Sequence, residues 1–190
     1  MGGLISVGYF LFNLFFSLVL FALWLRILFH YFRVSALQPI SQVIHTFTNP
    51  IVKPINSLLR LDRSRGHRFD WSCIIVVIIV ECFKYSILSL IMFGKMMPIS
   101  YLGLYVLVDL VVQPCNLLFY AVVIRAIMSW INPGVHHPIA EAIYFITEPL
   151  LKFARRYVPP ISGFDFSPIL IVVLLMVITL FMEGMLPMRL

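Results

Sequence analysis

The chain has 190 residues, of which 62% are hydrophobic and 12% are charged, and its formal net charge is +6. Soluble proteins contain roughly 25% charged residues, and a chain of this size has too small an interior to hide so much apolar surface. The composition therefore excludes an ordinary soluble domain and predicts an integral membrane protein of the all-α class.

Four apolar segments are long enough to be membrane-spanning helices, at residues 8–29, 71–93, 101–131 and 167–186. At about 1.5 Å per residue, each can cross a hydrocarbon core of roughly 30 Å. Arg26 lies near the far end of the first span, where we expect its long side chain to reach the lipid headgroups.

The basic residues indicate the orientation of these spans. Seven Lys or Arg lie from Arg26, near the end of the first span, to Arg68, and four lie from Arg125, near the end of the third span, to Arg156. By the positive-inside bias both segments are expected to be cytoplasmic, with both termini outside. The basic run at 60–68 lacks interleaved aromatic residues, so it favours contact with anionic lipid headgroups over nucleic acid.

Both cytoplasmic segments carry an amphipathic pattern, at about 39–60 and 138–158. Apolar residues recur at helical spacing from Ile51 and from Leu150, with basic residues on the opposite face. Such helices are expected to lie in the headgroup plane or against the bundle. A Thr-x-Pro sequence is predicted to break each helix in two, with Thr48 and Thr147 as N-caps of the second parts.

An internal repeat relates the two halves of the chain. Between residues 26–53 and 125–152, seven of 28 positions are identical, including Arg26 with Arg125 and Thr48 with Thr147. We therefore predict two parallel repeats, residues 1–99 and 100–190, each a helical hairpin with a broken amphipathic interfacial helix between its spans. A Phe-Asp pair precedes the second span of each repeat. Its aspartates, Asp70 and Asp165, are expected to accept hydrogen bonds from backbone or Arg donors.

The second half contains a specific motif that resembles the YggT family, also called YlmG. The residues that carry it are Arg125, Asn132, Pro133, Thr147, Glu148, Pro149, Arg155, Arg156, Pro159, Pro160 and Asp165. The first half departs from this motif: Asn49 stands in place of the glutamate, Arg33-Val34 in place of Asn-Pro, and the Pro-Pro pair is absent.

The resemblance implies a multi-pass protein of the bacterial inner membrane. Members of this family have been linked to osmotic or potassium tolerance, to division and nucleoid distribution, and to cytochrome b6 cofactor assembly in plastids. Three functions follow as hypotheses: a scaffold or assembly factor that contributes to osmotic-stress tolerance, a small ion channel or transporter, and a cytochrome maturation factor.

Polar residues inside the spans are expensive and therefore candidates for function. We expect seven of them to converge inside the bundle: Asn13, Glu81, Lys84, Asp109, Gln113, Asn116 and Glu183. They form either a polar core that fixes helix register or a path for ions or protons.

Motifs for catalysis are missing from the sequence. It has no HExxH, GxSxG, P-loop or dinucleotide-binding glycine pattern, and its three cysteines lie in apolar segments. We expect no enzymatic activity, no cofactor and no metal site. The expected partners are the lipid bilayer, anionic headgroups and other membrane proteins, not nucleic acid, and the sequence leaves the oligomeric state open.

Overall fold

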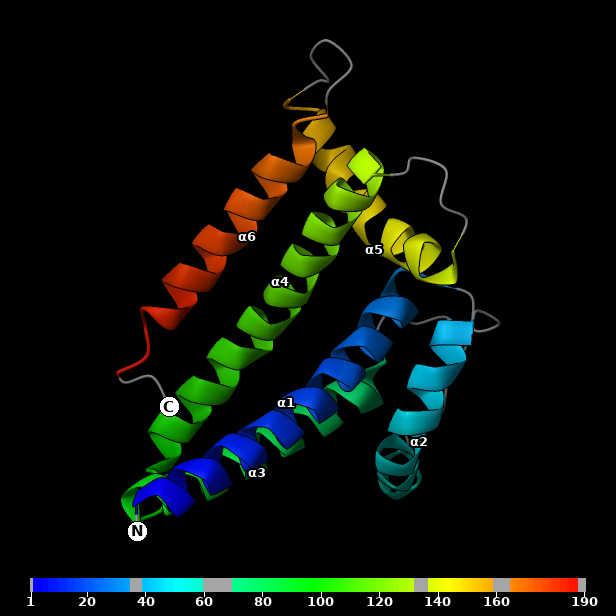
Figure 1. Ribbon diagram of the computed structural model, residues 1–190. Coiled ribbons are helices and arrows are strands. Elements are labelled where there is room, and N and C mark those ends of the chain that lie inside the picture. The colour runs from blue at the N-terminus through cyan, green and yellow to red at the C-terminus, as the bar shows by residue number, and fades with distance from the viewer. Residues whose placement is uncertain (1, 35–38, 60–69, 132–136, 159–164, 188–190) are drawn as a thin grey trace.

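The computed structural model describes residues 2–34, 39–59, 70–131, 137–158 and 165–187. Within these ranges the chain forms helices and no strand (Figure 1). The helices are α1 (Gly2–Tyr31), α2 (Pro39–Leu59), α3 (Trp71–Phe93), α4 (Ile99–Ile131), α5 (Pro138–Arg155) and α6 (Ser167–Glu183). The prediction of an all-helical protein is confirmed.

Three of these helices are long and apolar enough to cross a membrane: α1, α3 and α4. The spans predicted at 8–29, 71–93 and 101–131 lie within or nearly coincide with them. The fourth predicted span, 167–186, corresponds to α6, which ends earlier, at Glu183. Its 17 residues, most of them apolar, extend for about 25 Å, which is shorter than a typical hydrocarbon core.

The helices form two antiparallel pairs, α1 with α3 and α4 with α6 (Figure 1). The α2 helix packs against α1 and α3, and α5 runs across the ends of α4 and α6. Contacts of α4 with α1 and α3, and of α5 with α2, join the two groups. A short connection links α3 to α4, beginning at Gly94. Its φ of 63° is the left-handed conformation that a glycine C-cap adopts most readily.

Each crossing helix inserts a large, fully buried apolar side chain between the helices of its pair. Val52 of α2 packs with Leu23 and Val76 of the α1–α3 pair, and Leu151 of α5 packs with Val122 and Ile171 of the α4–α6 pair. The two side chains are 0% and 1% exposed. Both belong to the apolar stripes that the sequence predicts, so these stripes face the bundle.

The predicted breaks at Thr48 and Thr147 are wrong, because α2 and α5 are continuous through Pro50 and Pro149. Neither threonine is an N-cap. Each hydroxyl donates to the carbonyl four residues earlier, Ile44 and Ile143, at 2.7 Å in both cases. An interior proline costs a helix about 3 kcal/mol. Packing against the spans offsets this cost, a contribution that local propensity does not include.

Candidate functional site

Arg26 connects three helices in the first half of the chain. Its Nη1 donates to Thr48 Oγ1 at 2.9 Å and to Asn49 Oδ1 at 3.1 Å, both on α2. Its Nε lies 3.4 Å from Asp70 Oδ2, just before α3. The side chain is 3% exposed, so the expectation that Arg26 reaches out to headgroups is wrong. Two hydrogen bonds from Nη1 and the ion pair with Asp70 hold the guanidinium inside the protein.

Asp70 also defines the start of α3. It occupies the N-cap position, and its Oδ1 accepts a hydrogen bond from the backbone N–H of Cys73 at 3.2 Å. An aspartate at this position satisfies one of the unpaired N–H groups of the first turn. Asp70 therefore accepts a hydrogen bond from the backbone and forms an ion pair with Arg26, which ties the beginning of α3 to α1.

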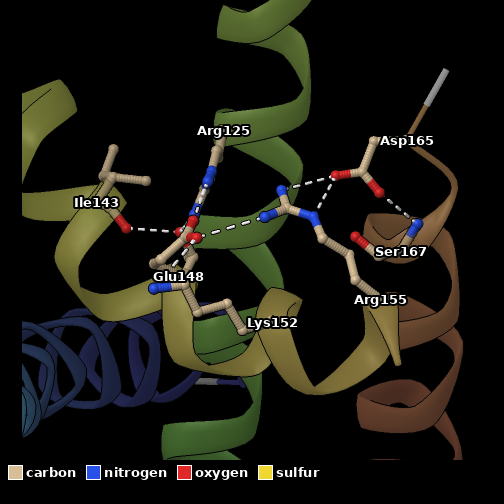
Figure 2. Close-up of polar contacts among 8 residues, drawn as sticks. Arg125, Ile143, Glu148, Lys152, Arg155, Asp165 and Ser167 are labelled. Atoms are coloured by element: carbon tan, nitrogen blue, oxygen red, sulfur yellow. Dashed lines mark hydrogen bonds and ion pairs between the residues drawn. The ribbon is translucent and has the colours of Figure 1, made fainter. Parts of the chain in front are cut away.

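Arg125 has the equivalent place in the second half (Figure 2). Its Nη1 donates to Thr147 Oγ1 at 2.9 Å, and its Nη2 donates to Glu148 Oε2. The guanidinium also lies 4.4 Å from the centre of the Tyr144 ring. These contacts hold α5 against α4, as the Arg26 contacts hold α2 against α1.

Glu148 joins Arg125 to a second arginine. Its Oε1 accepts from Arg155 Nη1 at 3.3 Å, and the exposed Lys152 Nζ lies 3.9 Å away. Arg155 in turn donates to Asp165 Oδ2 from Nε at 2.9 Å and from Nη2 at 2.7 Å (Figure 2). The result is a chain of alternating charges from Arg125 to Asp165 that connects α4, α5 and the start of α6.

Asp165 forms a hydrogen bond with the backbone at the start of α6. Its Oδ1 accepts from the backbone N–H of Ser167 at 2.9 Å. Partial burial raises the pKa of Asp165, but the hydrogen bonds from Ser167 and Arg155 outweigh this effect and the pKa is lowered on balance. The pKa of Arg155 is raised: partial burial lowers it, and the hydrogen bonds and charges of Asp165 and Glu148 more than compensate. Both groups are therefore charged at neutral pH.

The two networks differ at two equivalent positions. Asn49 stands where the second half has Glu148, and Asn56, at the same offset of 99 residues, stands where it has Arg155. In the first half Arg26 reaches the aspartate directly, whereas in the second half Glu148 and Arg155 lie between the arginine and the aspartate. The loss of a negative and a positive side chain together keeps both networks balanced in charge.

The other motif residues contribute less to this geometry. Pro149 lies inside α5, and Arg156, at the C-cap of α5, is exposed. Asn132, Pro133, Pro159 and Pro160 lie outside the described residues.

A second polar group lies between α3 and α4, where the sequence predicts a cluster inside the bundle. Lys84 Nζ lies 3.8 Å from Glu81 Oε2 and 3.5 Å from Asp109 Oδ2. Gln113 Nε2 donates to Glu81 Oε1 and, at 3.1 Å, to Asp109 Oδ2. The hydroxyl of Tyr85 donates to the same oxygen of Asp109 at 2.7 Å. Glu81 is 0% and Lys84 is 7% exposed.

Not all seven predicted members join this group. Asn13 and Asn116 are half-buried on α1 and α4, and no hydrogen bond or ion pair within the described ranges links them to it. Glu183 is half-buried and ends α6. Tyr85 is a member that the sequence analysis missed. Its position four residues after Glu81, on the same face of a helix, is the signal that would have found it.

Comparison with known proteins follows the same division of the chain. The family model described as CCB3/YggT matches residues 5–91 and 101–186. The chain belongs to the CCB3/YggT family. Each matched segment contains one complete arginine network, from Arg26 to Asp70 in the first and from Arg125 to Asp165 in the second.

Bacterial relatives cover most of this CCB3/YggT chain. YggT of Escherichia coli K12 is 31% identical over 83% of the chain and 79% of its own length. A protein of Haemophilus influenzae is 30% identical over 85% of the chain and 83% of its own length. Both are named as uncharacterized proteins. No solved structure matches the chain significantly.

Proposed function

We propose that the chain is a non-enzymatic scaffold of the bacterial inner membrane that holds a partner membrane protein. In this proposal α1, α3, α4 and α6 are its four spans, arranged as two parallel repeats. The α2 and α5 helices lie at the cytoplasmic face, and both termini are periplasmic. The concentration of Lys and Arg between the spans of each repeat supports this orientation.

Two observations support the duplication. The family model matches one segment in each half. The Arg26–Thr48 and Arg125–Thr147 hydrogen bonds join the same atoms at the same distance of 2.9 Å. The short α6 is the counterpart of α3 in this scheme, and a thinner or locally compressed bilayer accommodates a span of about 25 Å.

The observation that carries the scaffold proposal is the fixing of α2 and α5 to the spans. A helix that lies only in the headgroup region needs no hydrogen bonds to a span, yet each of these helices is held by an arginine, the buried Arg26 for α2 and the partly buried Arg125 for α5. Buried charged networks fix one arrangement of the helices more than they add stability. A fixed orientation is what a docking surface requires, because it presents the same side chains to the partner each time.

The outward faces of these two helices carry large exposed side chains. Phe47 of α2 is 72% exposed, and Phe153 of α5 is 54% exposed, with Tyr157 just beyond α5 at 69%. Lys152 and Arg156 are the chain neighbours of Phe153 and Tyr157 and are also exposed. Aromatic and arginine side chains are the types most enriched at protein interfaces, so this face suits a protein partner.

The test is site-specific photo-crosslinking in cells, with benzoylphenylalanine replacing Phe47 or Phe153. We expect each position to give a discrete adduct with a membrane protein. The Lys152→Glu/Arg156→Glu variant should reduce the adduct at position 153, because it reverses the charge of the same surface. Phe181, which is 70% exposed on α6, is the control for a lipid-facing position. Adducts no different from those at position 181 would mean that α2 and α5 contact only lipid, and the scaffold proposal would fail.

A contribution to osmotic-stress tolerance follows from the family resemblance and belongs to the same proposal. The crosslinking variants provide its test. Cells that carry only the Lys152→Glu/Arg156→Glu chain should grow more poorly at high osmolarity than cells with the unaltered chain. Equal growth of the two strains would mean that the docking surface does not contribute to osmotic tolerance.

The buried charges of α3 and α4 favour a second candidate, movement of cations or protons. Lys84, Glu81 and Asp109 are grouped inside the two helices best suited to span the membrane. In liposomes, Asp109→Asn should abolish cation or proton flux if this group is the path, and the exposed Lys53→Gln should leave it unchanged. Absence of flux for the unaltered chain under every gradient would eliminate this candidate.

A further inference from the structure

The group between α3 and α4 has an uneven number of charges. Glu81 and Asp109 are two carboxyl groups, and Lys84 is their only cation among the described residues, at 3.8 and 3.5 Å. Gln113 and Tyr85 add hydrogen bonds but no charge. With every group ionised, the cluster would carry a net charge of −1. An uncompensated charge in an apolar interior is strongly unfavourable.

The hydrogen bonds are distributed as unevenly as the charges. Asp109 Oδ2 accepts from Tyr85 and Gln113 and is the carboxyl oxygen nearest the Lys84 ammonium. Glu81 Oε2 is buried and accepts no hydrogen bond, although Gln113 donates to the other oxygen of the same carboxyl. Asp109 is thus held as a carboxylate, whereas Glu81 has one oxygen that lacks a donor.

Glu81 is also the group farthest from water. It is completely buried, whereas the side chain of Asp109 is 14% exposed. Ten residues separate Glu81 from the start of α3 at Trp71, which places it about 15 Å along the helix, near the middle of a bilayer-spanning segment. A carboxylate is most costly in such a place.

We propose that Glu81 binds one proton at Oε2 at neutral pH, so that the membrane interior holds a neutral group of Glu81–H, Asp109⁻ and Lys84⁺. The carboxylate takes the proton from water and becomes a carboxylic acid. Protonation removes the uncompensated negative charge, so that Lys84 and Asp109 are left as a balanced pair. The inference deepens the second candidate function by naming the proton as the ligand of the site.

A metal cation fits the same place less well. Alkali and divalent metal cations require several oxygen ligands that point toward them. Here Tyr85, Gln113 and Lys84 present donor atoms to the carboxylates, and the ammonium would repel a second cation. Within the described residues no three His, Cys, Asp or Glu side chains are grouped as a metal site requires.

Few other ionisable groups are near enough to change the charge balance. Tyr105 of α4 contacts the ring of Tyr85, with the two centres 5.2 Å apart. The charged side chain of α1, Arg26, is engaged by Thr48, Asn49 and Asp70, and that of α2, Lys53, is exposed. Glu183 ends α6, three residues before Leu186, which packs against Tyr85, Tyr105 and Val106.

Infrared difference spectroscopy of the full chain in liposomes tests the proposal, because a carboxylic acid has a C=O band that a carboxylate lacks. We expect a band at neutral pH that disappears in Glu81→Gln, whose amide mimics the neutral acid and so preserves the fold. Asp109→Asn should also remove it, because Glu81 and Lys84 then balance each other. Lys84→Met should enlarge the band, because both carboxyl groups lose their cation.

Two controls separate this site from other carboxyl groups. Glu141→Gln changes an exposed carboxylate of α5, and Glu183→Gln changes the nearest acidic residue of α6; both should keep the band. No acid band in the unaltered chain, or a band that survives in Glu81→Gln or Asp109→Asn, would overturn the proposal. A band in a chain that shows no flux would leave the proton site in place and remove only transport.

Discussion

Replacing Arg26 by Gln is expected to lower the free energy of unfolding by about 3 kcal/mol, the usual result of breaking a buried ion pair from one side. Arg26 is 3% exposed and is the only cation paired with Asp70 among the described residues. Its loss leaves Thr48 and Asn49 without their shared donor and Asp70 without its cation, and it removes the polar contacts that hold α2 against α1. Unfolding in mixed micelles, followed by tryptophan fluorescence, measures the change.

The equivalent change in the second half should be smaller, about 2 kcal/mol, a value typical of a lost hydrogen bond to a charged group. When Arg125 becomes Gln, Glu148 keeps Arg155 as a cation at 3.3 Å. Lys53→Gln removes an exposed charge of α2 and should change stability little. Equal losses for Arg26→Gln and Arg125→Gln would contradict the view that Arg155 makes the second network redundant.

The second prediction with a large effect concerns Glu148 and Arg155. Glu148→Asn alone should cost about 3 kcal/mol, because it leaves Arg125 and Arg155 facing each other without the carboxylate between them. Adding Arg155→Asn should recover part of that loss. The double variant has Asn at both positions, as Asn49 and Asn56 do in the first half, where the network is balanced without either charge.

A double-mutant cycle measures this coupling, which for residues in one ionic network is about 0.5–3 kcal/mol. Lys152→Asn paired with Glu148→Asn is the matched control, because Lys152 is 71% exposed and lies 3.9 Å from the same carboxylate. Its coupling should be much smaller. A double variant less stable than the sum of its single changes would show that the two halves do not use equivalent networks.

Part of the site could be predicted from the local sequence pattern. The offset of 99 residues aligned Arg26 with Arg125 and Thr48 with Thr147, and both pairs form the same hydrogen bond. Asp70 and Asp165 both accept from a backbone donor, and Asp165 also accepts from Arg155, in agreement with the backbone or arginine donors expected from the Phe-Asp repeat. A duplicated sequence repeats its local chemistry, so one comparison within the chain located both networks.

The errors arose where a distant partner decides the outcome. Arg26 was expected at the headgroups because its position near the end of an apolar segment permits that, but Thr48, 22 residues later, binds it inside the protein. The Thr-x-Pro sequences were expected to break their helices because proline has a low propensity for helix interiors. Packing of Val52 between α1 and α3, and of Leu151 between α4 and α6, overrides that propensity.

The sequence by itself determined the helical class, the places of the long apolar helices and the pairing of equivalent residues, because hydropathy and repetition are properties of the chain alone. Only the tertiary structure decided which polar residues meet. It joined Glu81, Lys84, Asp109 and Gln113, added Tyr85, and left Asn13 and Asn116 outside. The rotation of each helix about its axis sets these contacts, and that rotation depends on the packing of all the helices together.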